Sequence, residues 1–179
     1  MKNTSYNKKK YFIIIVDDYS RAVWVEPLAN KFEAVPKIKD YIQQLEMVYD
    51  IKVQGIMADN GTEFVNSLFK SFLSSKGIKL FTSVPYMPQQ NRVAERAIRT
   101  IVEGARSMIY AAKLPLFLWS IAVKTMMYLK NRSPTRANDG QTPIEQVTGE
   151  KPDLSHLRIF GQKLHFQKMP LIKSKKFFS

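Results

Sequence analysis

The stretch YFIIIVDDYSRAVWVEPL, Tyr11–Leu28, contains two apolar runs separated by a short polar cluster. Both runs are rich in β-branched and aromatic residues, which favour strands. The cluster DDYS, residues 17–20, consists of residues that favour turns. The sequence therefore predicts a β-hairpin, in which Asp17 and Asp18 have the ordinary role of turn formers.

Strands and helices alternate after this hairpin. Apolar residues recur at helical spacing over residues 31–49 and again over 62–76, and Gly77 is placed to end the second helix. Short apolar runs predict strands in IKVQGIMADNG (residues 51–61) and IKLFTSV (residues 78–84). This order predicts an α/β fold with a mixed sheet flanked by helices.

Two more helices are predicted, over residues 91–112 and 116–131. The first has an apolar seam whose residues are three or four positions apart: Ala94, Ile98, Ile101, Ala105, Met108 and Ala112. At about 100° per residue, the arginines of this helix fall on the side opposite the seam. Glu95 lies at the border between the seam and the arginines.

Length and composition exclude several classes of protein. The 179 residues suit one domain, and the absence of cysteine excludes disulfides and cysteine-bound zinc. No apolar run reaches the roughly 18 residues of a membrane span, and the run after the basic N-terminus is too short for a signal peptide. We therefore expect an intracellular protein with no membrane partner.

Net charge indicates the kind of partner. The chain has 28 basic and 15 acidic residues, a net charge of +13, which favours binding to DNA or RNA. A lysine-biased proteome would account for the lysines of the two ends. Between Tyr86 and Arg136, however, nine basic residues stand against Glu95 and Glu103 alone, and most are arginines. The guanidinium group suits phosphate especially well.

Two carboxylates occupy positions that suit chemistry. Asp59 follows a predicted strand, where open α/β sheets place their ligands, although Asp-Asn-Gly is also a common turn. Glu95 begins a helix, although an ordinary ion pair with Arg99 would explain it too. Two carboxylates from different elements are suitable ligands for Mg²⁺ or Mn²⁺.

His156 and His165 have no partners at zinc-ligand spacing, and we interpret both as surface or core residues.

The motifs DDYSR, DNGTEF, PYMPQQN, VAER and LP followed by LW occur in this order. The ordered set resembles the integrase catalytic core of copia-type long-terminal-repeat retrotransposons, which is related to retroviral integrases. Thirty-five residues separate Asp59 from Glu95, the spacing of that family's second aspartate and its glutamate. NRSPT, TPIE and GEKPDLSHLRIFG resemble the segment that comes after the core in copia polyproteins. The resemblance covers residues 11–168.

The resemblance implies a ribonuclease-H-like fold, a two-metal site for Mg²⁺ or Mn²⁺, and insertion of element DNA into target DNA. Asp59 and Glu95 match two of the family's catalytic, metal-binding carboxylates. Gln89 and Asn91 match the amide loop that contacts DNA ends in relatives. We expect further nucleic-acid contacts from the arginines of the following helix: Arg92, Arg96, Arg99 and Arg106. The expected partners are element ends, target DNA and further copies of the chain, with no small-molecule substrate.

The chain departs from the family in three places. The family's first carboxylate lies on a central strand upstream of the hairpin, but residues 1–10, MKNTSYNKKK, contain no Asp or Glu. The sequence therefore predicts that the first, central strand is missing, as in an N-terminally truncated or degenerate copy or in one fragment of a larger polyprotein. Arg92 stands where the family has glycine, which predicts an altered loop shape. Ala97 stands where relatives have lysine, which predicts one lost DNA contact.

Three interpretations of function stay open. The first is a retrotransposon integrase core that is catalytically incomplete and inactive alone. The second is a non-catalytic nucleic-acid-binding relic of a transposon. The third is an active metal-dependent nuclease or integrase that uses Asp17 or Asp18. We expect a basic segment at residues 1–10, a core-like domain at 11–136 and a post-core segment with a basic tail at 137–179, with the nucleus as the place of DNA integration.

Overall fold

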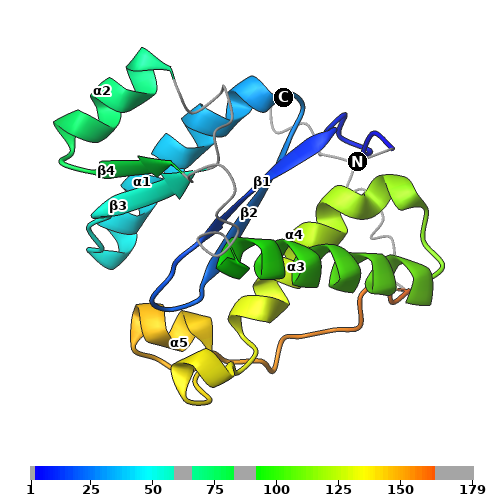
Figure 1. Cartoon of the computed structure of the whole chain (residues 1–179). Helices are drawn as coiled ribbons and strands as arrows, with labels where there is room; N and C mark the ends of the chain where they lie inside the picture. The colour runs from blue at the N-terminus through cyan, green and yellow to red at the C-terminus, as the bar shows by residue number, and fades with distance from the viewer. Residues whose placement is uncertain (1–2, 59–65, 83–91, 164–179) are drawn as a thin grey trace, which may run out of the picture.

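The computed structural model describes residues 3–58, 66–82 and 92–163 (Figure 1). Its strands are β1 (Tyr11–Val16), β2 (Val23–Leu28), β3 (Gly55–Ala58) and β4 (Lys79–Thr82). β1 and β2 pair antiparallel, which confirms the predicted hairpin, and β3 and β4 pair parallel in a separate two-stranded sheet. The predicted α/β architecture with flanking helices is therefore confirmed.

The helices lie close to their predicted ranges. They are α1 (Ala34–Tyr49), α2 (Ser67–Ser75), α3 (Arg92–Ala111), α4 (Trp119–Asn131) and α5 (Pro143–Thr148). Short 3-10 turns precede three of them: η1 (Lys31–Glu33), η3 (Leu116–Leu118) and η4 (Arg136–Asn138). α2 begins where the Asn66 side chain accepts a hydrogen bond from the Phe69 amide, and Gly77 follows its end with φ 69°. In the described part of the chain, no helix has the length and apolarity needed to cross a membrane.

One core lies between the hairpin and the α3–α4 pair, and we call it the hairpin core. Its buried residues are Val23, Val25, Ala97, Ile101, Ala105, Ile109, Trp119, Ala122 and Val123. Gly104 allows α3 to approach α4 closely, because a Cβ at this position would collide with the side chain of Met126. Figure 1 shows α3 and α4 side by side next to the hairpin.

A second core lies under the parallel strands, and we call it the parallel core. Its buried residues are Val35, Ile38, Ile42, Phe69, Leu73 and Ile78, from α1, α2 and the residue before β4. Ile56 of β3 and Leu80 of β4 pack against this core from one face of the sheet. Their neighbours Met57 and Phe81, which are partners in the β3–β4 register, are exposed at 52% and 51%.

β1 contributes to both cores. Phe12, Ile14 and Val16 pack against the hairpin core, whereas Ile13 and Ile15 pack against the parallel core. A strand that is apolar on both faces is typical of the interior of a sheet. Among the described strands, however, β1 pairs only with β2, and its other edge has no described partner.

Local and long-range hydrogen bonds together fix the turn of the hairpin. The carboxylate of Asp17 accepts hydrogen bonds from the amide and the hydroxyl of Ser20, at 2.8 and 2.6 Å. Asn138 of η4 donates to the Ser20 carbonyl at 2.7 Å, and Asn131 of α4 binds both the amide and the carbonyl of Val23. Asp17 therefore forms the turn, as predicted, and residues more than a hundred positions away hold that turn in place.

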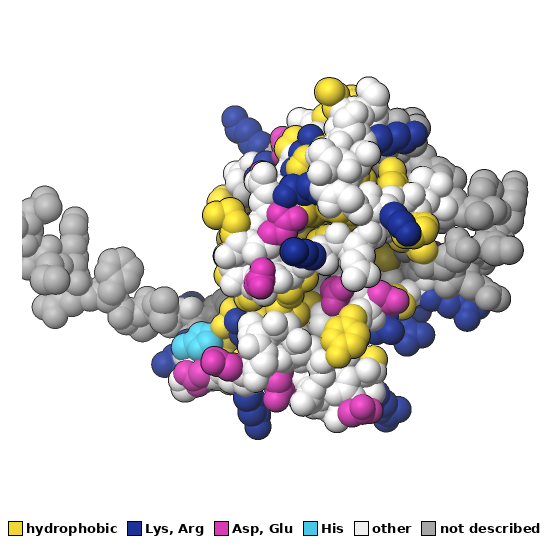
Figure 2. Space-filling view, turned by 90° about the vertical axis from the view of Figure 1, so that its left-hand side faces the viewer, with side chains coloured by type: hydrophobic (Ala, Val, Ile, Leu, Met, Phe, Trp, Pro, Cys, Tyr) yellow, Lys and Arg dark blue, Asp and Glu magenta, His cyan; other side chains and the backbone are white. Residues whose placement is uncertain are grey.

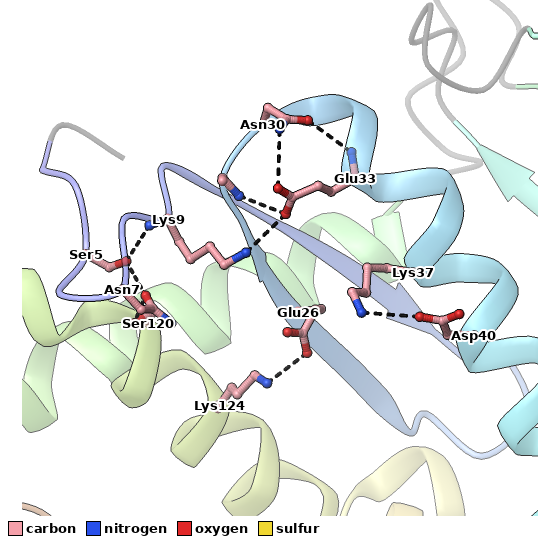
Figure 3. Close-up of polar contacts among 11 residues, drawn as sticks. Ser5, Asn7, Lys9, Glu26, Asn30, Glu33, Lys37, Asp40, Ser120 and Lys124 are labelled. Carbon is pink, nitrogen blue, oxygen red and sulfur yellow. Dashed lines mark hydrogen bonds and ion pairs between the residues drawn. The ribbon is translucent and has the colours of Figure 1, made fainter.

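The basic N-terminal residues are attached to the start of α4. The indole of Trp119 donates to the Asn3 carbonyl at 3.0 Å, and the Tyr6 amide donates to the Phe117 carbonyl. Figure 3 shows Ser5 and Asn7 beside Ser120 of α4, and Lys9 paired with Glu33 of η1 at 3.1 Å. These contacts connect residues 3–9 to η1, η3 and α4.

Candidate nucleic-acid interface and metal site

α3 carries a row of arginines on its outer face. Its buried residues Ala97, Ile101, Ala105 and Ile109 define the inner face. At about 100° per residue, the arginines lie within about 80° of one another on the opposite side. They are Arg92, Arg96, Arg99 and Arg106, and each is exposed. None of them forms an ion pair with another described residue, so their charges are available to a ligand.

Glu95 lies in the first turn of α3 and is exposed. Its position on the helix is between the buried face and the arginine row, as the sequence predicted. The ion pair with Arg99, which was the ordinary explanation for this glutamate, is not formed, and no other described residue pairs with Glu95. The carboxylate therefore has no structural role in the described part of the molecule.

Three predicted site residues lie outside the described residues: Asp59, Gln89 and Asn91. β3 ends at Ala58, the residue before Asp59. α3 begins at Arg92, the residue after Asn91. The prediction that Asp59 and Glu95 reach one metal ion thus stays a prediction. Within the described ranges, no three His, Cys, Asp or Glu side chains are grouped as a metal site would require.

The carboxylates of the two aspartates in the hairpin turn both bind to other residues of the same turn. Asp17 binds Ser20, and Asp18 forms an ion pair with Arg21, whose backbone has a positive φ of 60°. Both side chains therefore have local partners that explain them. Their geometry favours the role of turn formers over that of metal ligands.

Two expectations for α3 need correction. Ile98, expected in the apolar seam, is 38% exposed, and Ala94 is only partly buried. The direction of the seam is as predicted, but the first two turns of α3 extend beyond the hairpin core. Position 97 was expected to mark a lost DNA contact, yet Ala97 is buried at 8% in the hairpin core. A side chain at position 97 therefore points into the protein.

Sequence reasoning missed a cluster around Tyr128 on α4. The Tyr128 hydroxyl lies 2.6 Å from Nε2 of His156, and the two rings meet edge to face. The guanidinium of Arg132 stacks on the Tyr128 ring at 3.5 Å from its centroid. His156 is therefore an exposed residue with a specific partner. No local pattern indicates this contact, because the partners are 28 positions apart.

Comparisons with known proteins agree with this architecture. Residues 1–88 match the integrase core domain family. The chain is 38% identical, over 90% of its length, to the retrovirus-related Pol polyprotein from transposon TNT 1-94 of Nicotiana tabacum, and covers 12% of that protein. It is 32% identical, over 88% of its length, to the corresponding polyprotein from transposon RE2 of Arabidopsis thaliana, and covers 11% of it. The chain thus spans about a tenth of the curated relatives it matches.

Two solved structures share the fold. The catalytic core domain of BIV integrase matches 81% of this chain and 89% of its own, with a TM-score of 0.57 and 24% identity. The simian T-cell lymphotropic virus intasome in complex with PP2A regulatory subunit B56 gamma matches 93% of this chain and 57% of its own, with a TM-score of 0.65 and 18% identity. Fold, family match and curated relatives agree: residues 1–88 belong to the integrase core domain family, the chain has the ribonuclease-H-like fold, and its curated relatives are copia-type Pol polyproteins.

Proposed function

We propose that the chain is the DNA-binding part of a retrotransposon integrase core, whose metal site is incomplete within residues 1–179. The observation that carries this proposal is the arginine row on α3 beside Glu95, none of which forms an ion pair within residues 3–58, 66–82 and 92–163. Element ends and target DNA are the proposed ligands, and further copies of the chain are proposed partners in the nucleus.

The spacing of the arginines suits a nucleic-acid backbone. Arg92, Arg99 and Arg106 are seven positions apart, so at about 1.5 Å per residue each step along α3 covers about 10.5 Å. One DNA strand advances about 3.4 Å per nucleotide, so each step spans about three nucleotides. By contrast, the face that carries α1 and α2 shows Lys/Arg and Asp/Glu side chains intermixed (Figure 2). We therefore assign DNA binding to α3.

Asp59 and Glu95 are the proposed metal-binding carboxylates. Carboxylate oxygens suit hard divalent cations, and Glu95 has no competing partner among the described residues, so the donor set fits Mg²⁺ or Mn²⁺. When bound, such ions activate water or a 3′-hydroxyl and stabilise the leaving oxygen. The chain's own contribution is to hold the two carboxylates and, through the arginines, to fix the DNA backbone.

The open edges of the sheets support the incompleteness of the site. β1 is apolar on both faces but pairs on one edge, and β3 is a parallel strand that also pairs on one edge. Both sheets pack on the parallel core, and Met57 of β3 is exposed. We propose that one more strand belongs between β1 and β3 and carries the third carboxylate. Such a strand would pair with the backbone groups of two edges that have no partner among the described strands.

DNA binding is tested by salt titration of a fluorescent duplex. We expect affinity to fall steeply between about 50 and 200 mM salt, with a slope set by the number of phosphate contacts. The double variant Arg96→Ala/Arg99→Ala should bind all sequences more weakly and reduce the slope by about 2. Lys37→Ala/Lys70→Ala is the matched control, because it removes the same charge from α1 and α2. Salt-independent binding, or equal loss in both variants, would contradict the assignment to α3.

Catalysis is tested by strand transfer from a labelled DNA end in Mg²⁺ or Mn²⁺. We expect no joining or nicking above background by the chain alone, because a missing ligand misplaces the nucleophile and can lower the rate about a hundredfold. Fusing an upstream strand with its aspartate from a complete relative should restore activity that Glu95→Gln removes again. Robust transfer by the unmodified chain, lost in Asp17→Asn or Asp18→Asn, would favour the third interpretation instead.

Measuring the affinity for Mn²⁺ distinguishes an integrase core from a transposon relic that only binds nucleic acid. If Asp59 and Glu95 share an ion, Asp59→Asn and Glu95→Gln should each weaken binding of Mn²⁺, and the double variant should be no weaker than either single variant. A chain that keeps only its basic surface would bind DNA, but neither substitution would change its affinity for Mn²⁺.

A further inference from the structure

A groove runs between the α3–α4 pair and residues 153–163, which we call the C-terminal strap. The strap is attached at one end by His156 to Tyr128 and at the other by Phe160, which packs against the hairpin core. Gly161 lies so close to Ala112 that a Cβ there would collide with it. The groove between these attachments is open, with a volume of about 830 Å³. That volume is within the range of sites that hold ligands.

The floor of the groove is apolar and adaptable. Met108 of α3, Met127 of α4 and Phe160 of the strap line it, and Ala111 lies at its edge on α3. Methionine side chains fit varied partners and are frequent at protein-binding surfaces. Beside the groove, Ile159 of the strap is 80% exposed. Together with the floor of the groove, Ile159 extends the apolar surface that a partner would cover.

Tyr128, one of the aromatic residues that line the groove, is not available for base stacking on both faces. Arg132 covers one face of Tyr128, and His156 meets its edge. Single-stranded nucleic acid is bound by open aromatic faces along a basic groove. The methionine floor and the covered tyrosine therefore favour a protein segment over a nucleic acid.

The charged residues around the groove indicate which kind of protein segment would bind there. Arg158 of the strap and Arg132 form no ion pair with a described residue, whereas Lys124 pairs with Glu26 at 2.8 Å (Figure 3). Asp153 is the acidic residue of the strap, and its carboxylate accepts hydrogen bonds from Ser155. Arg158 lines the groove and donates to the carbonyls of Ser155 and Leu157, and Arg132, beside the groove, donates to the Tyr128 carbonyl. Neither guanidinium meets a carboxylate among the described residues. Residues 164–179 of this chain carry four lysines and no acid, so like charges oppose their binding here.

We propose that this groove binds a short acidic, amphipathic segment of a partner protein. Apolar side chains of the segment would cover Met108, Met127 and Phe160, and its carboxylates would pair with Arg158 and Arg132. An amphipathic helix in an apolar groove with a complementary rim is a common mode of peptide recognition. This site is separate from the arginine row of α3, and neither assignment depends on the other.

The test is selection of displayed 12-residue peptides on the full chain. We expect the selected peptides to combine acidic and large apolar residues, and to bind Ala111→Glu at least tenfold more weakly. Ala111 is exposed, so this substitution adds a repelling carboxylate to the groove without entering a core. Ser107→Glu, one turn earlier on the same helix at an exposed residue outside the groove lining, is the matched control and should keep full peptide binding. Arg158→Gln should weaken binding in the same direction as Ala111→Glu.

Three outcomes would overturn the proposal. One is that no selected peptide distinguishes Ala111→Glu from Ser107→Glu. Another is that a thymidine oligonucleotide binds the chain and loses affinity in Ala111→Glu but not in Arg96→Ala/Arg99→Ala, which would make the groove a nucleic-acid site. The third is self-association, measured by sedimentation, that Ala111→Glu abolishes, which would make the groove an interface between copies.

Discussion

The two cores of this molecule differ in how completely their strands are covered. The hairpin core is closed by β1, β2, α3 and α4, and side chains distant in sequence, such as Asn131, hold its edges. The parallel core has helices on one face of β3 and β4 only, and Met57 and Phe81 on the other face are half exposed. Parallel sheets normally have both faces covered.

Among the described residues, the half built on the hairpin core is thus closed, whereas the half built on the parallel core has one uncovered sheet face. The hairpin half, which consists of β1, β2, α3 and α4 around the hairpin core, supports α3, whose outer face carries the arginines. The parallel half leads into Asp59, and its sheet is two strands wide. We therefore expect the chain to bind DNA through α3 in the hairpin half. We expect it to show no strand-transfer activity, because the parallel half does not complete the proposed metal site.

The largest expected effect is that of Phe69→Ala in the parallel core. Phe69 is fully buried, so its truncation should cost about 3–5 kcal/mol. We expect the loss of hydrogen-exchange protection to be concentrated in α1, α2, β3 and β4, because the hairpin core keeps its own contacts. Exchange measured by mass spectrometry after proteolysis checks this. Equal loss of protection in α3 and α4 would show that the two halves unfold as one unit.

The second effect tests the closure of the hairpin half. Asn131→Ala removes the partner of both backbone groups of Val23, which is 3% exposed, and should cost about 1–3 kcal/mol. Urea denaturation measures the change. The control is Thr125→Ala on the same helix, whose hydroxyl bonds only to an exposed carbonyl, and which should change stability by about 0.5 kcal/mol or less. Comparable losses in the two variants would mean that Asn131 does not close this half.

A smaller effect is expected at the start of α2. Asn66→Ala removes the side chain that caps the helix at Phe69 and should cost about 1 kcal/mol, felt within the parallel half. Ser67→Ala, at the first position of the helix, is the neighbouring control. Exchange of the α2 amides is the sensitive measurement, and unchanged protection in Asn66→Ala would show that the cap contributes nothing to this half.

The smallest effect concerns the contact between the halves. Tyr41 of α1 stacks on Trp24 of β2 with 4.9 Å between ring centroids. Burial, together with the charge of Asp17, raises the pKa of Tyr41 from 10.0 to about 12. A raised pKa means that the folded state holds the proton more tightly, so this contribution to stability is complete below pH 10 and is lost as the pH rises through 12.

Absorbance of tyrosinate during an alkaline titration checks the value for Tyr41. We expect a late step in the titration of the wild-type chain that is absent from Tyr41→Phe. If every tyrosine of the wild-type chain titrates near the ordinary pKa of about 10, the two halves are not packed together at Trp24.

Much of the site could be read from local pattern. The helical period of residues 91–112 placed Glu95 between a buried seam and four exposed arginines, and the structure has that arrangement. The exposed Ile98 and the buried Ala97 could not be read in this way. The period gives the direction of a helix face, whereas the point at which the neighbouring core ends depends on strands and helices far away in sequence.

The sequence by itself determined the hairpin, the helices, the arginine face and the family, because turn chemistry, periodicity and ordered motifs are local properties of the chain. Only the tertiary structure decided that the Asp17 carboxylate accepts hydrogen bonds from Ser20, that Asn131 and Asn138 fix the hairpin, and that His156 contacts Tyr128. It also decided that the described strands form two separate sheets with open edges. Pairing between strands and contacts between distant side chains depend on which surfaces meet when the chain collapses, and no local pattern encodes that choice.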